Sequence, residues 1–191
     1  LGRRMGMRMT DNQGVAQYKL TQAAQQQAGV PVVHNHAGGS VFTVSSPKAS
    51  VIVGQIGGHQ STAGAMTIQS PEFEKNFGAL TLNTMDDKPI EQSSRLLLVH
   101  MGEVLNTDMR FRDAQRKIVE DWGKLPLLAQ RVQSQLRMKV NQPQQLTVYA
   151  VDLAGHRVGQ VKTQHADGML MLDADTRAFD QGIIAYEIIR R

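Results

Sequence analysis

Apolar and polar residues alternate along this chain over short segments that are separated by turn-forming residues. The sequence GALTLNT over residues 78–84 alternates one by one, and Leu136, Met138 and Val140 repeat the same period. A period of two places the apolar side chains on one face of a β-strand and the polar ones on the other. The pattern therefore predicts strands that turn one face toward a core.

One stretch departs from this alternation. Residues 96–99 form the unbroken apolar run LLLV, with turn formers before it at residues 86–89 and after it at residues 106–108. A short apolar run bounded by turn signals is typical of a strand that is buried on both faces. We expect this run to form a central strand of a sheet, covered by the rest of the chain.

Further strand signals are closely and regularly spaced. They occupy residues 5–9, 15–20, 30–36, 40–45, 49–56, 65–69, 145–151, 157–162, 168–172 and 183–189. Residues 21–29 favour a short helix or a loop, and the composition of residues 127–132 is compatible with helix. Many short strands between Gly, Pro, Asp and Asn turns are typical of a sandwich or barrel. We expect an all-β fold, namely an antiparallel two-sheet β-sandwich of jelly-roll type with at most one short helix.

The sequence indicates one domain over residues 1–191, because no linker or internal repeat divides it. Residues 1–29 either complete the sandwich or form a lead-in segment. The opening LGRRMGMRM has no initiator methionine and enters an alternating pattern at once. We interpret the chain as a fragment of a longer protein.

Composition narrows the possible functions. The chain has 41% apolar residues, which is enough for a core, and no cysteine, which excludes disulfides and thiolate metal sites. The net charge of +4 is spread along the chain, and aromatic residues make up only 5%. Nucleic-acid binding normally shows clustered basic charge with interleaved aromatics. No apolar stretch is long enough to span a bilayer, so we expect neither nucleic acid nor membrane as a partner.

Histidines offer the one candidate metal site. His34 and His36 flank Asn35, so both imidazoles would lie on one face of a strand, where they could share a metal ion. A third ligand would have to come from His59 or His100. The simpler interpretation is a pair of polar residues beside a Gly-Gly turn, and we predict no metal and no cofactor.

The carboxylates and the single tryptophan each allow a functional and a structural interpretation. Asp86, Asp87 and Glu91 could serve glycosidic acid–base chemistry, although adjacent acids in a turn more often stabilise the turn. The acids at residues 11–14 and 173–175 match calcium loops poorly. Trp122 could stack on a sugar, but its apolar Trp-Gly context favours the core. We predict no catalytic residue in this chain.

The ordered pieces of the sequence resemble a known family. These are FTVSSPKASVIVG (residues 42–54), GALTLNTMDDKPIEQSSRLLLVHMGEVLNTDMRF (78–111), WGKLPLLAQRV (122–132), LTVYAVDLAGHRVGQV (146–161) and AYEI (185–188). In this order the chain resembles the C-terminal β-sandwich region that follows the catalytic (β/α)-barrel in large bacterial glycoside hydrolases. The chain departs from that group at Met85-Asp86-Asp87 and at Asp108.

The resemblance implies a non-catalytic sandwich module of a secreted polysaccharide-degrading enzyme. Such a module would pack on the catalytic barrel, outside the cytoplasm, and the catalytic carboxylates would lie elsewhere in the parent protein. It also implies that Asp86, Ser93, Asn106 and Thr107 fix turns and strand ends. Two alternatives remain: an independent module that binds a polysaccharide, and a free-standing structural or interaction domain.

Overall fold

The computed structural model describes the backbone of residues 32–35 and all atoms of residues 41–72, 77–114 and 116–191. The chain divides into two units, Leu1–Val30 and Pro31–Arg191, and every described residue belongs to the second. The predictions for residues 1–29 and for His36 lie outside the described residues.

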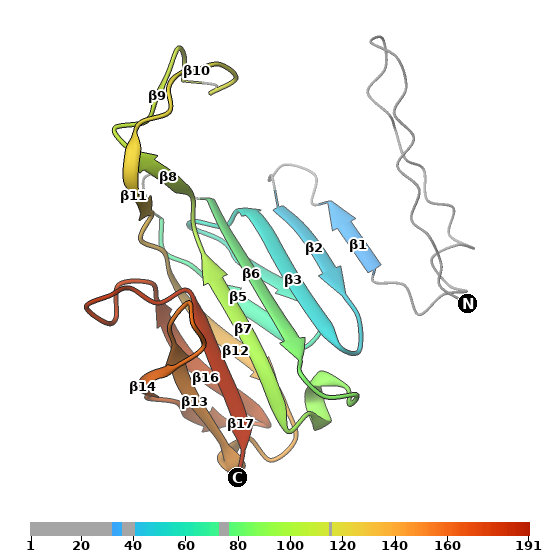
Figure 1. Cartoon of the computed structure of the whole chain (residues 1–191). Helices are drawn as coiled ribbons and strands as arrows, with labels where there is room; N and C mark the ends of the chain where they lie inside the picture. Colours follow the sequence, from blue (N-terminus) through green and yellow to red (C-terminus); the bar gives the residue numbers. More distant parts are fainter. Residues whose placement is uncertain (1–31, 36–40, 73–76, 115) are drawn as a thin grey trace, which may run out of the picture. The chain divides into compact units, whose positions relative to one another are not determined.

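The second unit is an all-β sandwich with two main sheets, as the sequence predicts (Figure 1). The large sheet has eight antiparallel strands in the order β1-β2-β3-β6-β7-β17-β13-β14. Their bounds are β1 (Val32–Asn35), β2 (Val41–Ser45), β3 (Ala49–Gln55), β6 (Phe77–Thr84), β7 (Arg95–Met101), β17 (Ala185–Arg190), β13 (Leu146–Val151) and β14 (Arg157–Val161).

The small sheet has five antiparallel strands in the order β15-β16-β12-β5-β4 and lies behind the large sheet in Figure 1. Its strands are β15 (Gln164–Ala166), β16 (Met169–Asp175), β12 (Gln133–Lys139), β5 (Met66–Gln69) and β4 (Gln60–Ala63). The helical content of the described residues is two short 3₁₀ turns, η1 (Ile90–Gln92) and η2 (Pro143–Gln145).

Alternate residues of both sheets fill the space between them. On the large sheet Leu82, Leu98 and Tyr186 are directly opposite one another and are at most 1% exposed. On the small sheet Ile68 and Leu136 are an equivalent pair. The predicted period of two is therefore the period of the core, because every second side chain of a strand points to the same face.

The apolar run at residues 96–99 forms β7, which is the fifth strand across the large sheet, as expected of a central strand. Leu96 and Leu98 are buried in the core, but Leu97 and Val99 on the other face are only partly covered. The prediction of burial on both faces is thus wrong for the described residues. The described part of the chain covers one face of β7 and leaves the other partly exposed.

A two-stranded extension leaves the sandwich beyond the end of β7; we call it the arm. The arm consists of β8 (Val104–Thr107), β9 (Arg110–Phe111), β10 (Val119–Asp121) and β11 (Lys124–Ala129), with β8 paired to β11 and β9 to β10. Figure 1 shows it projecting past the ends of β6 and β7. Of residues 127–132, for which composition allowed helix, 127–129 belong to strand β11 and 130–132 form no helix. In the described part of the chain no helix has the length and hydropathy to cross a membrane.

Candidate docking face

The outer face of the large sheet is unusually apolar. Residues that lie opposite each other in antiparallel strands share a face, and the register places Val51 opposite Thr81, Thr81 opposite Val99 and Val99 opposite Ala185. The apolar residues of this face, all of them partly or well exposed, are Phe42, Val44, Val51, Val53, Ala79, Leu97, Val99, Met101, Ala185 and Ile189. We call this surface the sheet face.

The outer face of the small sheet has the opposite character. Strand β12 exposes Gln133, Gln135, Arg137 and Lys139, and β5 and β4 add threonine and glutamine. Strand β16 adds Asp173 and Asp175 beside the partly exposed Met169 and Met171. An antiparallel sheet with one solvated face normally carries polar residues there. The small sheet follows this rule and the sheet face does not. A contiguous apolar surface of this kind indicates an interaction site.

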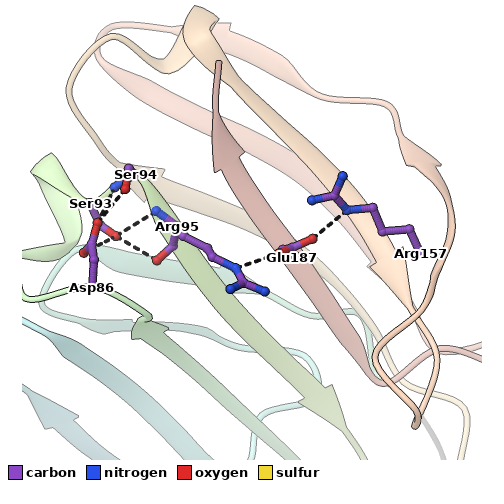
Figure 2. Close-up of polar contacts among 6 residues, drawn as sticks. All are labelled: Asp86, Ser93, Ser94, Arg95, Arg157 and Glu187. Atoms are coloured by element: carbon purple, nitrogen blue, oxygen red, sulfur yellow. Dashed lines mark hydrogen bonds and ion pairs between the residues drawn. The ribbon is translucent and has the colours of Figure 1, made fainter.

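An ionic cluster lies on the β17 side of the sheet face, where Glu187 is directly opposite Leu97 (Figure 2). Glu187 accepts hydrogen bonds from Arg157 Nε and Arg95 Nε, both at 2.7 Å, and its side chain is only 11% exposed. The hydrogen bond from Arg157 is the main cause that holds the pKa of Glu187 below its usual range. The Arg157 guanidinium also lies 4.4 Å from the Tyr149 ring centre. With two arginines on one carboxylate, the cluster carries excess positive charge.

Asp86 has a structural role, as the sequence predicts. Its Oδ1 accepts a hydrogen bond from Ser93 Oγ at 2.8 Å, and its Oδ2 accepts two from the backbone and hydroxyl of Ser94 at 2.8 and 2.7 Å (Figure 2). These bonds, those from Ser94 first, hold the pKa of Asp86 far below its usual range. The same hydrogen bonds stabilise the turn that leads into β7. The other two acids of this loop form ion pairs, Asp87 with Lys48 and Glu91 with Lys139.

Asn106 and Thr107 stabilise the arm in a similar way. Asn106 Nδ2 donates to the carbonyl of Trp122, and Thr107 Oγ1 donates to the carbonyl of Pro126, both at 2.7 Å. These side chains tie β8 to the returning strand. Their hydrogen bonds confirm the prediction that Asn106 and Thr107 stabilise strand ends.

His100 lies between the two sheets, and its ring contacts serine hydroxyls. Its Nε2 is 3.2 Å from Ser134 Oγ, which is 2.7 Å from Ser70 Oγ, while Nδ1 has no hydrogen-bond partner among the described residues. Burial lowers the pKa of His100 to about 4, so the ring is neutral at pH 7. Both serines are themselves buried, which keeps this serine–histidine pair away from any substrate.

The structure does not assemble the other candidate ligands. His59 is exposed, and the described residues contain no group of three His, Cys, Asp or Glu that could hold a metal ion. Arg131 donates to both carboxylate oxygens of Asp175, at 3.1 and 2.6 Å, and so takes the place a cation would need. The side chains of His34 and His36 lie outside the described part of the chain.

The prediction that Trp122 lies in the core is wrong. Trp122 is 69% exposed and follows β10 at the bend of the arm. Gly123 after it has φ +68, and a Cβ at Gly123 would collide with the backbone of Thr107. The Trp-Gly pair therefore belongs to a tight bend between the paired strands. The sequence feature that could have indicated an exposed tryptophan is the following segment KLPLLA, in which apolar and polar residues do not alternate. This segment forms β11, and all six of its residues are exposed.

Comparisons with protein-family models, curated proteins and solved structures found no match. The fold and its surfaces define the class of protein: an antiparallel β-sandwich with one solvated polar face, one open apolar face and a projecting arm.

Proposed function

We propose that this chain is a non-catalytic β-sandwich module that docks on another part of a larger protein through the sheet face. The observation that carries this proposal is the contrast between the two outer faces of one sandwich. Both sheets line one core, but the outer face of the small sheet is mainly polar, whereas that of the large sheet is mainly apolar, with Thr81, Asn83, Arg95 and Glu187 among its apolar residues. The run at residues 96–99 has the composition of a doubly buried strand, and a docked partner would supply the missing cover.

The resemblance described above supports a particular kind of parent protein. It suggests a bacterial polysaccharide-degrading glycoside hydrolase, with its catalytic (β/α)-barrel as the docked domain and a location outside the cytoplasm. The excess positive charge at Glu187 adds one requirement to the partner surface. It should be apolar at its centre and carry carboxylates where it meets Arg95 and Arg157, because complementary charge at the rim fixes orientation.

The experiment is a calorimetric titration of this chain with the separately expressed remainder of its parent protein. We expect a one-to-one complex with a negative heat-capacity change, which is the mark of apolar burial. Val51→Lys together with Val99→Lys should weaken the complex by more than about 100-fold, because two ammonium groups would be buried without partners.

The matched control is Thr67→Lys with Gln135→Lys on the outer face of the small sheet. These residues also lie on neighbouring strands and face outward. The control variant should bind like the wild type. Absence of any complex, or equal losses in the two variants, would contradict the proposal.

A carbohydrate-binding module is the second candidate, and the exposure of Trp122 favours it. A hollow of about 510 Å³ on the small sheet is also lined by the amides Gln69, Gln133 and Gln135, which could bind hydroxyl groups. The hollow has no aromatic side chain among its lining residues. Titration with soluble polysaccharides decides between the candidates: a saturable signal that is lost in Trp122→Ala with unchanged melting would favour this second function.

A further inference from the structure

The arm exposes the other large group of apolar side chains in the described residues. Trp122 is 69% exposed, Leu125 77%, Leu127 59% and Leu128 54%. Strands β8 and β11 pair only with each other in the part of the chain that the structure describes. A two-stranded hairpin of this kind is marginally stable in water by itself. The arm therefore needs a cover that the sandwich does not provide.

An apolar cleft lies at the base of the arm. It has a volume of about 570 Å³ and is bounded by Leu127 and Leu128 of β11, by Val151 and Leu153 near the β13–β14 turn, and by Phe179 in the loop before β17. Leu153 is 89% exposed at its edge. The volume and the apolar lining are those of a site that receives side chains of a partner. One molecule thus carries both an apolar projection and an apolar cleft.

The charges of these two surfaces suit contact between identical copies. The arm neutralises its own charges in ion pairs across the hairpin, such as Lys124 with Asp108 and Arg110 with Asp121. The charged residues that line the cleft are two arginines and two aspartates, so they balance. In a two-fold dimer both copies present the same surfaces, so a surface with excess charge would bring like charges together. The positive cluster at Glu187 would oppose such self-association through the sheet face, whereas the arm and cleft would not.

We propose that a second copy of this chain covers the arm, in a two-fold symmetric dimer in which the arm of each copy lies in the cleft of the other. Because the cleft is at the base of the arm, two arms laid antiparallel bring Trp122 and Leu125 of one copy to the cleft of its partner. Figure 1 shows the arm extending beyond the ends of β6 and β7. The dimer uses surfaces separate from the sheet face, so it does not rest on the proposed docking function.

The exposed apolar area is sufficient for a stable dimer. If full burial removes roughly 200 Å² for tryptophan and roughly 100 Å² for leucine, the exposed fractions of Trp122, Leu125, Leu127 and Leu128 leave about 330 Å² of apolar side chain per copy. Two arms and the equal area that they cover give roughly 1,300 Å², which is within the size range of specific interfaces.

The experiment is sedimentation velocity of the complete chain over a wide concentration range. The wild type should form a concentration-dependent dimer. Leu125→Asp on the arm and Leu153→Asp at the cleft should each weaken it by more than about 100-fold, because symmetry places every substitution in the interface twice. Both side chains are among the most exposed of the apolar residues, so the melting temperature of each variant should equal that of the wild type at a concentration at which the wild type is also monomeric.

Two further samples make the test specific. Val99→Lys on the sheet face should leave the dimer intact. An equimolar mixture of Leu125→Asp and Leu153→Asp should recover a heterodimer weaker than the wild-type dimer, because one arm and one cleft remain compatible. A chain that is monomeric at every concentration, or a dimer that survives both aspartate variants, would overturn the proposal. So would a monomer whose Trp122 fluorescence changes only with the parent protein or a polysaccharide.

Discussion

Strand β7 allows the openness of the sheet face to be measured with two neighbouring leucines. Leu98 is 0% exposed and lies in the core opposite Leu82 and Tyr186, while Leu97 points to the sheet face and is partly exposed. The two residues share a strand and a chemical type. Truncation of each to alanine therefore compares one buried face with one open face.

The expected magnitudes differ clearly. Leu98→Ala should destabilise the protein by about 4 kcal/mol, because it removes a fully buried side chain and leaves a cavity. Leu97→Ala should cost about 1.5 kcal/mol, because part of its surface is already in water and no enclosed cavity forms. For a domain of this size these values correspond to losses in melting temperature of about 12 °C and about 4 °C.

Urea unfolding followed by far-ultraviolet circular dichroism is the appropriate assay. It reports on strand content, whereas the fluorescence of Trp122 reports on the arm. Equal losses for the two alanine variants would refute the reasoning, because they would mean that the isolated chain already covers both faces of β7.

Other predictions test the remaining sites. At a concentration at which the chain is monomeric, Trp122→Ala should change the free energy of unfolding by less than about 0.5 kcal/mol, as for other exposed residues, and a loss near the 3–5 kcal/mol typical of a core aromatic would contradict its exposure. The lowered pKa of His100 means that the folded state prefers the neutral ring. Stability should thus be complete above the unfolded pKa of about 6.5 and fall by about 3 kcal/mol as the pH drops toward 4. A flat stability profile between those pH values, or an NMR titration of His100 near 6.5, would disprove this. Glu187→Gln should cost about 1–2 kcal/mol, since it removes the charge between two arginines that are themselves partly exposed, whereas the exposed Asp87→Asn should cost almost nothing. Finally, the isolated chain should hydrolyse no glycan of a broad panel, and turnover that is abolished by a single carboxylate substitution would contradict a non-catalytic role.

Much of the fold could be predicted from the period of two. The strands around Leu80 and Leu136 alternate buried residues with partly or fully exposed ones, and both are found where the sequence predicts them. The strand around Val148 is also found where the sequence predicts it, although five of its six residues are buried. Strand β4 could not be predicted, because QSTA has no large apolar residue and is a strand only through its pairing with β5. Strand β11 contains Pro126 and lacks alternation, so its pairing with β8 likewise depends on tertiary structure.

The surfaces were harder to predict than the core. An apolar run such as LLLV shows that both faces of a strand avoid water, but it does not show whether the same chain or a partner covers them. Trp122 poses the same difficulty, because a tryptophan beside leucines has the same local sequence in a core and in an interface. Only the register of the sheets reveals that Leu97 and Val99 share an open face.

The most direct test of the docking face uses the absence of cysteine from the sequence. Single-cysteine variants Val99→Cys on the sheet face and Thr67→Cys on the small sheet would be labelled with a thiol reagent, alone and with the remainder of the parent protein. We expect both thiols to react in the isolated chain, and only the thiol at position 99 to be protected in the complex. Equal reactivity of position 99 with and without the partner, or protection of position 67 in its place, would contradict the assignment of the sheet face as the docking surface.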